Sequence, residues 1–394
     1  MPWKPISLPE ERLRLVLAAL EKREPFSVLC RRFGISRKCA YKWLKRFREG
    51  GGKALCDRSR RPLHSPRRLK TRWVKAIGAA HRRRPSWGAK KLCVLLHRQH
   101  PRARLPAVRT IHGWLRRLHL VPRRRARTRR GPLLPAPRHT LALAPNDVWT
   151  IDFKGWFRTL GGKRCDPLTV RDLFSRFILA MPLARDLSEA HVRGLLRRVF
   201  ARYGLPRAIQ VDNGAPFGGK GALGLSRLSV WWVRLGIKVE FGRRACPQDN
   251  AGHEQMHRVY KAETLHPPAA TRRAQQGRTT RWIRQYNEER PHEALGQKVP
   301  AKFYRASGRV DGARVESLVY PEKWRVRRVR AHGDIKWQGR LRFIGRAFAG
   351  ERIALKPLAP GIHQVYLGRL LIGHLHDGDP AGLRPARWQR APGA

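Results

Sequence analysis

The sequence is poor in acidic residues. It has 27 Asp and Glu against 86 Lys and Arg in 394 residues, which gives a formal net charge of +59. A field of that sign and size attracts polyanions, so nucleic acid is the expected partner. Arginine-rich codon usage in the source genome would explain part of the excess. It would not explain why carboxylates remain at a few positions flanked by apolar residues.

The sequence also lacks long apolar runs and paired cysteines. No uncharged apolar run reaches the roughly 18 residues that a membrane span needs, and the N-terminal stretch contains no apolar segment typical of a secretory signal. The six cysteines are scattered without a Cys-x-x-Cys pair. These absences favour a reduced, intracellular protein with no membrane partner and no structural zinc site.

The N-terminal part, residues 1–55, is predicted to be an all-α helix-turn-helix module. Residues 8–23 show an apolar helical stripe of Leu13, Val16, Leu17 and Leu20. After it come a short helix from Ser27, a turn at Gly34 and a second helix capped by Ser36. On that last helix a basic face would meet the DNA major groove, and its residues are Arg37, Lys38, Tyr41, Lys42 and Lys45. A plain three-helix unit with a solvated basic face is the alternative.

A second helix-turn-helix-like module is predicted for residues 63–121. Its helices would cover about 67–82, 88–97 and a stretch that begins with Pro106. Residues 122–145 follow as a basic, Pro-rich linker that either lies along phosphates or acts as a solvated spacer. Two tandem modules would span a longer DNA site than one.

Residues 146–306 alternate strands and helices, which predicts an α/β domain with a mixed five-stranded sheet. Three antiparallel strands come first, in DVWTIDFKG, PLTVRDL and RFILAMPL. Parallel strands in PRAIQVDNG and IKVEFG follow, joined by helices. A last helix begins near Gln248.

Three carboxylates in this domain have unlike, largely apolar settings. Asp152 lies in the first strand, Asp212 ends the fourth strand, and Glu254 lies on the last helix. Carboxylates from separate elements suit Mg²⁺, and two such ions can promote in-line displacement at phosphorus. The structural alternatives are an Arg pair for Asp152, an Asx turn for Asp212 and a surface position for Glu254. Taken together, the three acids favour the catalytic interpretation.

Several ordered motifs resemble the integrase core of bacterial insertion-sequence transposases, the DDE group related to retroviral integrases. These motifs are WTIDFKGWF, VDNGAPF, LSRLSVWWVRLGI, PQDNAGHEQMHR and YNEERPHEALGQKVPA. The resemblance implies a ribonuclease H-like fold, with Asp152, Asp212 and Glu254 as catalytic and metal-ligating acids. It implies Mg²⁺ as cofactor, with two ions and with Mn²⁺ able to substitute.

The resemblance also implies a reaction and its partners. Water would cut at the ends of a transposable element, and the freed 3′-hydroxyls would attack target DNA. The partners would be double-stranded DNA, both terminal inverted repeats and target, bound by a homo-oligomer in the bacterial cytoplasm at the nucleoid. The sequence departs from the family pattern at Ala245-Cys246 and at Ala251, both close to the Glu254 helix.

The Glu254 helix carries further basic residues. Arg258 and Lys261 share the face of Glu254 and could hold a DNA end by its phosphates. Ion pairing with Glu254 or Glu263 is the alternative. For the signature Arg290, Pro291 and His292 a structural role is preferred.

The remaining chain alternates with a period of two. Residues 315–378 predict a small all-β, SH3-like barrel with a basic surface, and residues 379–394 predict a basic tail. The sequence thus predicts a multidomain DNA transposase. The rival functions are a nuclease that does not join strands and a DNA-binding regulator or domesticated protein with an inactive core.

Overall fold

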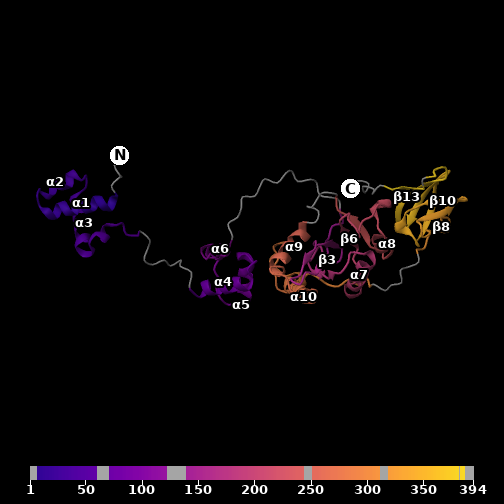
Figure 1. Ribbon diagram of the computed structural model, residues 1–394, viewed down its shortest axis with the longest axis horizontal. Helices are drawn as coiled ribbons and strands as arrows, with labels where there is room; N and C mark the ends of the chain where they lie inside the picture. Colours follow the sequence, from indigo (N-terminus) through magenta and orange to yellow (C-terminus); the bar gives the residue numbers. More distant parts are fainter. Residues whose placement is uncertain are drawn as a thin grey trace. The chain divides into compact units, whose positions relative to one another are not determined.

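The computed structural model describes residues 7–59, 71–121, 139–243, 251–310, 318–380 and 382–386. The chain divides into two compact units, Met1–Leu69 and Lys70–Ala394, and each is described by itself. Figure 1 shows the ribbon, coloured from indigo at the N-terminus to yellow at the C-terminus. In the described residues, no helix is both long and apolar enough to cross a membrane.

The first unit has the predicted helices. They are α1 (Leu8–Glu21), α2 (Phe26–Arg32) and α3 (Arg37–Gly50), followed by a short 3-10 helix, η1 (Gly52–Leu55). Gly34 joins α2 to α3 with a φ of 62°, a conformation that glycine adopts without strain. The Ser36 hydroxyl caps α3 by accepting the Cys39 N–H at 3.2 Å. The turn and the cap therefore lie where the sequence predicts them.

The buried face of α1 differs from the predicted stripe. Leu15 and Val16 are buried, whereas Leu17 and Leu20 are 47% and 45% exposed. Because α1 contacts both α2 and α3, its buried face is fixed by two partners and is rotated from the single stripe that periodicity suggests. The helix was predicted correctly, but its orientation was not.

The second unit begins with three more helices, α4 (Thr71–Arg83), α5 (Ala89–Gln99) and α6 (Val108–Arg117). Leu92, Ile111 and Leu115 are fully buried among them. The predicted second helical set is confirmed, although α6 starts at Val108 after an N-cap at Ala107 and Pro106 lies outside it.

The core of the second unit is a mixed α/β sheet, as predicted. Its strands are β1 (Val148–Phe153), β2 (Phe157–Arg158), β3 (Arg164–Asp172), β4 (Ile178–Ala180), β5 (Leu183–Ala184), β6 (Ala208–Val211) and β7 (Lys238–Phe241). The strand order is β2-β3-β1-β6-β7, with β4 and β5 also paired to β3. β1 pairs antiparallel with β3 and parallel with β6, and β6 pairs parallel with β7. The two-residue strands β2 and β5, too short for any alternation, bring the predicted five strands to seven.

Helices cover both faces of this sheet. They are α7 (Glu189–Tyr203), α8 (Arg227–Arg234), α9 (Ala251–Thr264) and α10 (Arg272–Glu288), with short 3-10 helices η2 (Ala222–Gly224), η4 (Glu293–Leu295) and η5 (Pro300–Lys302). Alternate residues of β1 face opposite sides. Trp149 and Ile151 belong to the apolar cluster that α7 and α8 complete. Thr150 faces the other side, where its hydroxyl lies 3.4 Å from His253 Nε2 of α9. α9 and α10 therefore lie across the sheet from α7 and α8.

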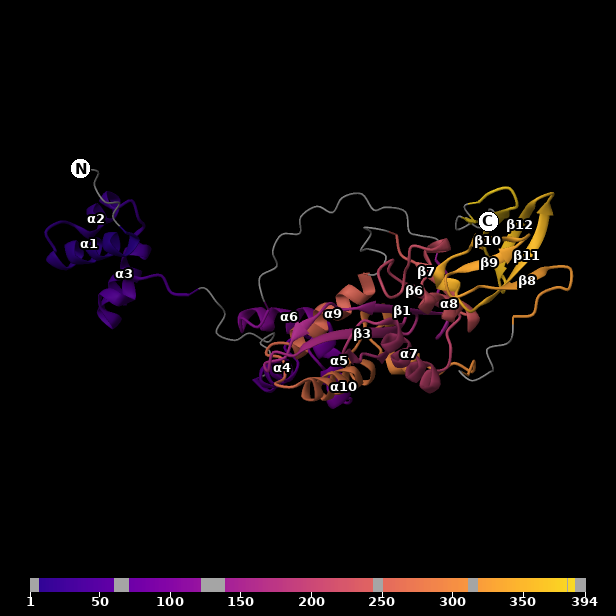
Figure 2. The same ribbon diagram turned by 45° about the vertical axis from the view of Figure 1, so that its right-hand side comes forward.

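The C-terminal part is all-β, as predicted. It contains β8 (Arg325–Arg328), β9 (Asp334–Trp337), β10 (Arg340–Phe343), β11 (Arg352–Ala359), β12 (Ile362–Leu367), β13 (Leu370–His376) and β14 (Leu383–Pro385), with the 3-10 helix η6 (Arg346–Phe348). The five-stranded order is β14-β13-β12-β11-β8, and β9 and β10 form a separate pair. η6 packs against α8 of the core, and Figure 2 shows α8 beside this module.

The predicted basic tail needs correction. Residues 383–385 form β14, which pairs antiparallel with β13. These residues form a strand because β13 lies beside them, and the composition of the tail does not reveal this neighbour. Residues 387–394 of that tail and residues 122–138 of the predicted linker lie outside the described residues.

Candidate active site

Asp152 and Asp212 lie at the same end of two neighbouring parallel strands. In the register of β1 with β6, Val148 faces Ala208 and Thr150 faces Gln210. Carried two residues further, this register sets Asp152 opposite Asp212. The carboxyl ends of parallel strands are where open α/β sheets commonly hold ligands. The structure thus brings together two of the three predicted acids.

Asp212 also shapes its own turn. It follows β6 directly, is exposed, and its Oδ1 accepts the Gly214 N–H at 3.2 Å. This is the Asx turn that the sequence offers as the structural alternative. A Cβ at Gly214 would lie 3.2 Å from Asp212 Oδ2, so glycine leaves the carboxylate uncrowded.

Glu254 lies on the first turn of α9 and is exposed. It makes no hydrogen bond or ion pair with the described residues. α9 begins at Ala251, one of the two departures from the family pattern, whereas Cys246 lies outside the described residues. The helix predicted from about Gln248 is confirmed from Ala251 on.

Arg171 of β3 holds the first turn of α9. Its Nη1 donates to Gly252 O at 2.6 Å. Burial lowers the pKa of Arg171 to about 10, so the guanidinium stays protonated near neutral pH. A Cβ at Gly252 would lie 2.6 Å from Arg171 Nη2, and a side chain there would displace this buried group. Glycine two residues before Glu254 therefore allows a fixed helix start.

Two stacked histidines join α9 to the sheet. The rings of His253 and His257 lie 5.4 Å apart and nearly parallel. His257 Nε2 lies 3.1 Å from Thr169 Oγ1, and that hydroxyl donates to Asp152 O at 2.8 Å. Because the single hydroxyl proton goes to Asp152 O, the His257 ring must donate through Nε2–H. Burial lowers the pKa of His257 to about 3, so the ring is neutral. These two hydrogen bonds link α9, the helix of Glu254, to the backbone of Asp152.

Cations gather near the acids. Arg258 and Lys261 are exposed on α9, as predicted, and neither forms an ion pair with the described residues. Burial, and then repulsion by Lys261, lowers the pKa of Lys154, two residues beyond Asp152. Lys154 and Lys261 are therefore close enough to interact. Such a pair fits a site that receives phosphate.

The acids do not form a complete metal-ligand set. Across the described ranges, no three His, Cys, Asp or Glu side chains cluster so that they could hold a metal ion. Carboxylate oxygens are ligands that Mg²⁺ prefers, so Asp152 and Asp212 fit as two of them. Residues 244–250, which precede the helix of Glu254, lie outside the described residues.

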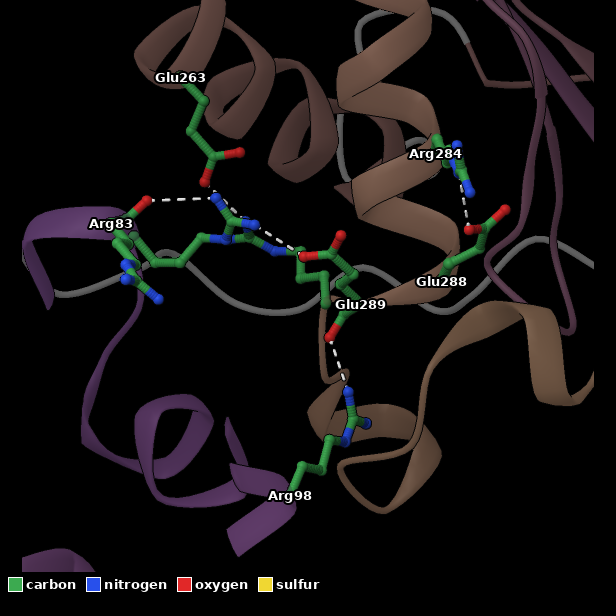
Figure 3. A network of polar contacts seen from close by, with 8 residues as sticks. Arg83, Arg98, Glu263, Arg284, Glu288 and Glu289 are labelled. Carbon is green, nitrogen blue, oxygen red and sulfur yellow. Dashed lines mark hydrogen bonds and ion pairs between the residues drawn. The ribbon is translucent and has the colours of Figure 1, made fainter. Parts of the chain in front are cut away.

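The other end of α9 is held by a polar network, part of which is drawn in Figure 3. Arg290 Nη1 donates to Glu263 Oε1 at 2.7 Å, and Trp282 Nε1 donates to Glu263 Oε2 at 2.6 Å. The Ser86 hydroxyl also bonds to Glu263. Arg290 is only 4% exposed and lies near the Trp87 ring. The preferred structural role for Arg290 is thus supported.

Further contacts tie α4 and α5 to the core. Arg84 Nη2 bonds to Glu289 Oε2 at 2.7 Å, and Arg98 Nη1 donates to Glu289 O at 3.1 Å. Lys90 pairs with Glu293. Figure 3 shows Arg98 and Glu289 facing each other. The acidic residues in this region therefore form contacts with basic residues of the second helical module.

In the first unit, the basic face of α3 has the predicted exposure. Its exposed residues are Arg37, Lys38, Tyr41, Lys42 and Lys45. The Tyr41 ring packs at 4.5 Å from the Phe26 ring, and Lys45 Nζ lies 3.9 Å from Glu49 Oε1. Ala40, Trp43 and Leu44 are buried on the opposite side. This face is available for a ligand.

Sequence reasoning missed three residues of the site. Thr169 and Arg171 on β3 carry no local signal, since their roles depend on which strand lies beside β1. Lys154 had a signal, because it stands in the same motif as Asp152. His257, three residues beyond Glu254 on α9, turns inward to Thr169.

Five stretches of the chain match known domain families. The matches are residues 11–62 to a helix-turn-helix domain, 39–115 to a homeodomain-like domain, 142–247 and 235–300 to the integrase core domain, and 324–376 to the C-terminal domain of IS481 family transposases. The N-terminal matches indicate DNA binding. The integrase matches indicate an enzyme that processes nucleic acid.

Two relatives come from bacterial insertion elements. An uncharacterized 31.7 kDa protein of the element IS407 from Burkholderia multivorans is 29% identical over 231 residues, which are 58% of this chain and 79% of the relative. An uncharacterized 39.2 kDa protein of the element IS476 from Xanthomonas euvesicatoria is 31% identical over 248 residues, 61% of this chain and 66% of the relative.

A solved structure is also similar. It is the HTLV-2 integrase catalytic core domain in complex with magnesium, with a TM-score of 0.33 and 14% identity. The similarity covers 42% of this chain and 100% of that one. Together, the domain matches and the insertion-element relatives support an insertion-sequence transposase that has a retroviral-integrase-like core.

Proposed function

We propose that the chain cuts DNA at the ends of a transposable element and joins the freed 3′-hydroxyls to target DNA. What supports this reaction most is the pairing of β1 with β6, which carries Asp152 and Asp212 to the same end of two parallel strands. Oxygen donors at such a place suit a divalent cation. A transposition-type function follows from the family, whereas the two chemical steps are the proposal.

The proposed catalytic acids are Asp152, Asp212 and Glu254, which would also hold two Mg²⁺ ions, with Mn²⁺ able to substitute. When bound, these ions would activate the attacking oxygen and neutralise the charge on the leaving oxygen. Since the three acids do not cluster in the described residues, the first turn of α9 would complete the set when DNA binds. Thr169 and His257 would keep α9 aligned with Asp152.

The DNA partners are assigned by the basic surfaces. The helical modules, proposed as residues 1–55 and 63–121, would read terminal inverted repeats, with the exposed basic face of α3 in the major groove. Arg258 and Lys261 would hold the phosphates of the DNA end. A homo-oligomer would bring two ends together at the bacterial nucleoid.

The test uses the full chain and a labelled duplex that carries an element end. We expect Mg²⁺-dependent cleavage and a joined product with target DNA. Asp152→Asn, Asp212→Asn and Glu254→Gln should each abolish both steps while end binding persists. Glu322→Gln, an exposed acid of the C-terminal module, is the matched control. Full activity in any of the three variants would refute the site.

A second candidate is a DNA-binding protein with an inactive core. One observation favours it, namely that the described residues hold no three-residue metal-ligand cluster. It predicts end binding without cleavage in both Mg²⁺ and Mn²⁺. A nuclease without strand joining predicts cleavage and no joined product, so the same assay separates all three functions.

A further inference from the structure

A basic groove lies between the integrase-like core and the C-terminal module. It has a volume of about 1240 Å³ and is walled by α7, α8 and the segments 328–331 and 347–351. We call it the α7–α8 groove. Its two acids are Glu189 and Glu351, and its six arginines are Arg193, Arg197, Arg227, Arg234, Arg328 and Arg330. Cations from two helices and from the β-module therefore converge on one space.

Half of these arginines are already paired or bonded. Arg234 Nε lies 3.2 Å from Glu351 Oε2, and Arg330 Nη1 lies 3.2 Å from Asp334 Oδ2. Arg227 Nε donates to a backbone carbonyl at 3.4 Å. Within the described part of the chain, no ion pair is formed by Arg193, Arg197 or Arg328. The groove keeps a surplus of positive charge that its own acids do not neutralise.

Arg193 has a buried hydrogen-bond donor without an acceptor. Its guanidinium lies 4.9 Å from the Trp231 ring centroid, and its Nε is buried without a hydrogen-bond partner. Burial, and then repulsion by Arg197, lowers the pKa of Arg193. A buried donor left without an acceptor costs about 1–3 kcal/mol in general. An anion in the groove would supply the acceptor and relieve the repulsion.

The groove and the candidate acids lie on different sides of the sheet. α7 and α8 pack on the face that contains Trp149 and Ile151. α9, with Glu254, packs on the face that contains Thr150. A duplex with its reacting phosphate at the acids would not pass through the groove without wrapping around the core.

We propose that the α7–α8 groove binds the phosphate backbone of a second stretch of duplex DNA, apart from the stretch that reacts at the acids. Phosphate contacts by arginine position a duplex without reading its sequence. This DNA is either target DNA or element DNA away from the cut end. The choice between target DNA and element DNA rests on the proposed function. The binding of duplex backbone in the groove does not.

The direct test is arginine labelling of the full chain with phenylglyoxal, read by mass spectrometry. The probes are an element-end duplex, a duplex of arbitrary sequence, and both together. Arg197 and Arg328 should be protected by duplex, whereas the neighbouring exposed Arg198 outside the groove should react equally with and without it. Protection by the end duplex alone assigns element DNA. Protection that needs the second duplex assigns target DNA.

A charge-matched pair of variants gives a second readout. One replaces Arg193, Arg197 and Arg328 by Gln; the control replaces Arg198, Arg202 and Arg340, which are exposed and outside the groove. Each lost phosphate contact lowers the salt slope of binding by ~0.9, so the slope should fall by about 2.7 in the groove variant and by far less in the control.

Two results would overturn the groove as a DNA site. One is equal labelling of Arg197 and Arg328 with and without every duplex. The other is protection that grows with protein concentration in the absence of DNA, which would make the groove a contact between copies. If strands are never joined but the groove is protected by duplex, the proposed function fails and the groove stands.

Discussion

Glu254 and Glu263 lie at opposite ends of α9 in opposite surroundings. Glu254 is exposed and has no polar partner within the described residues. Glu263 bonds to Arg290, to Trp282 and to Ser86 of the preceding helical module. An unpaired acid can bind a ligand, whereas a paired and partly buried acid holds elements together. The same residue type would therefore serve the proposed chemistry at one end of the helix, whereas at the other end it holds packed elements together.

The largest effect is expected for Glu254→Gln. It should reduce end cleavage and strand joining to background, because a carboxylate proposed as a metal ligand is lost. Stability should change by no more than about 0.5 kcal/mol, since the residue is exposed and unpaired. Chemical denaturation of the same preparation measures this change in stability. If Glu254→Gln lost its fold together with its activity, Glu254 would be needed for stability, as Glu263 is expected to be.

Glu263→Gln should do the reverse. Removing one partner of a buried ion pair costs about 3–5 kcal/mol, and Arg290 would stay buried without its carboxylate. We expect the unfolding free energy of the core to fall by roughly 3 kcal/mol, with strand joining per folded molecule largely retained.

The matched control is Glu288→Gln on α10. Glu288 pairs with Arg284 at 3.1 Å, and both side chains are more than half exposed. Figure 3 shows the pair at the edge of the network. An exposed helix pair contributes about 0.3–0.5 kcal/mol. Equal destabilisation by Glu263→Gln and Glu288→Gln would show that the network around Glu263 does not stabilise the core.

The third prediction concerns His292, which adjoins the Glu263 network. Burial, and then repulsion by Lys91, lowers the pKa of His292 to about 3. In the unfolded chain a histidine pKa is about 6.5, so the unfolded state takes up the proton first as pH falls. Stability is therefore lost between about pH 6.5 and pH 3, by up to about 1.4 kcal/mol per pH unit.

His292→Gln should flatten this dependence, measured by urea unfolding at several pH values. His97→Gln, at an exposed position of α5, serves as the control for loss of a surface histidine. An unchanged slope in His292→Gln would mean that the ring already binds its proton in the folded state over this range.

The smallest effect is expected for Lys261→Gln. Lys261 is exposed on the face of Glu254, and its loss removes about one phosphate contact. End binding should weaken a few-fold, and the salt slope should fall by about 0.9. Lys323→Gln, an exposed lysine of the C-terminal module, is the control. A slope that Lys261→Gln leaves unaltered would remove Lys261 from the DNA interface.

Periodicity and turn residues were enough to predict most elements. Ser36 caps α3 as predicted, because its hydroxyl accepts a backbone N–H, and the Ser188 hydroxyl caps α7 in the same way. The order of antiparallel and then parallel strands also follows from the sequence, because helices separate the later strands. These features depend on residues close together in the chain.

Features that depend on distant residues could not be predicted. Glu263 meets Arg290 only because α9 and α10 pack together, and helix spacing instead offered Arg258 or Lys261 as partners. His257 points inward because Thr169 lies beside Asp152 on the adjacent strand. Each such contact can be predicted only when the strand order or the helix packing is known.

The most direct measurement is to map the metal itself. Fe²⁺ in place of Mg²⁺, with ascorbate and peroxide, cleaves a protein backbone close to the bound ion. In the full chain with an element-end duplex, we predict cuts near residues 152, 212 and 254, which Mg²⁺ suppresses and Asp212→Asn abolishes. Cuts elsewhere, or cuts that survive Asp212→Asn, would contradict a metal site between β1, β6 and α9.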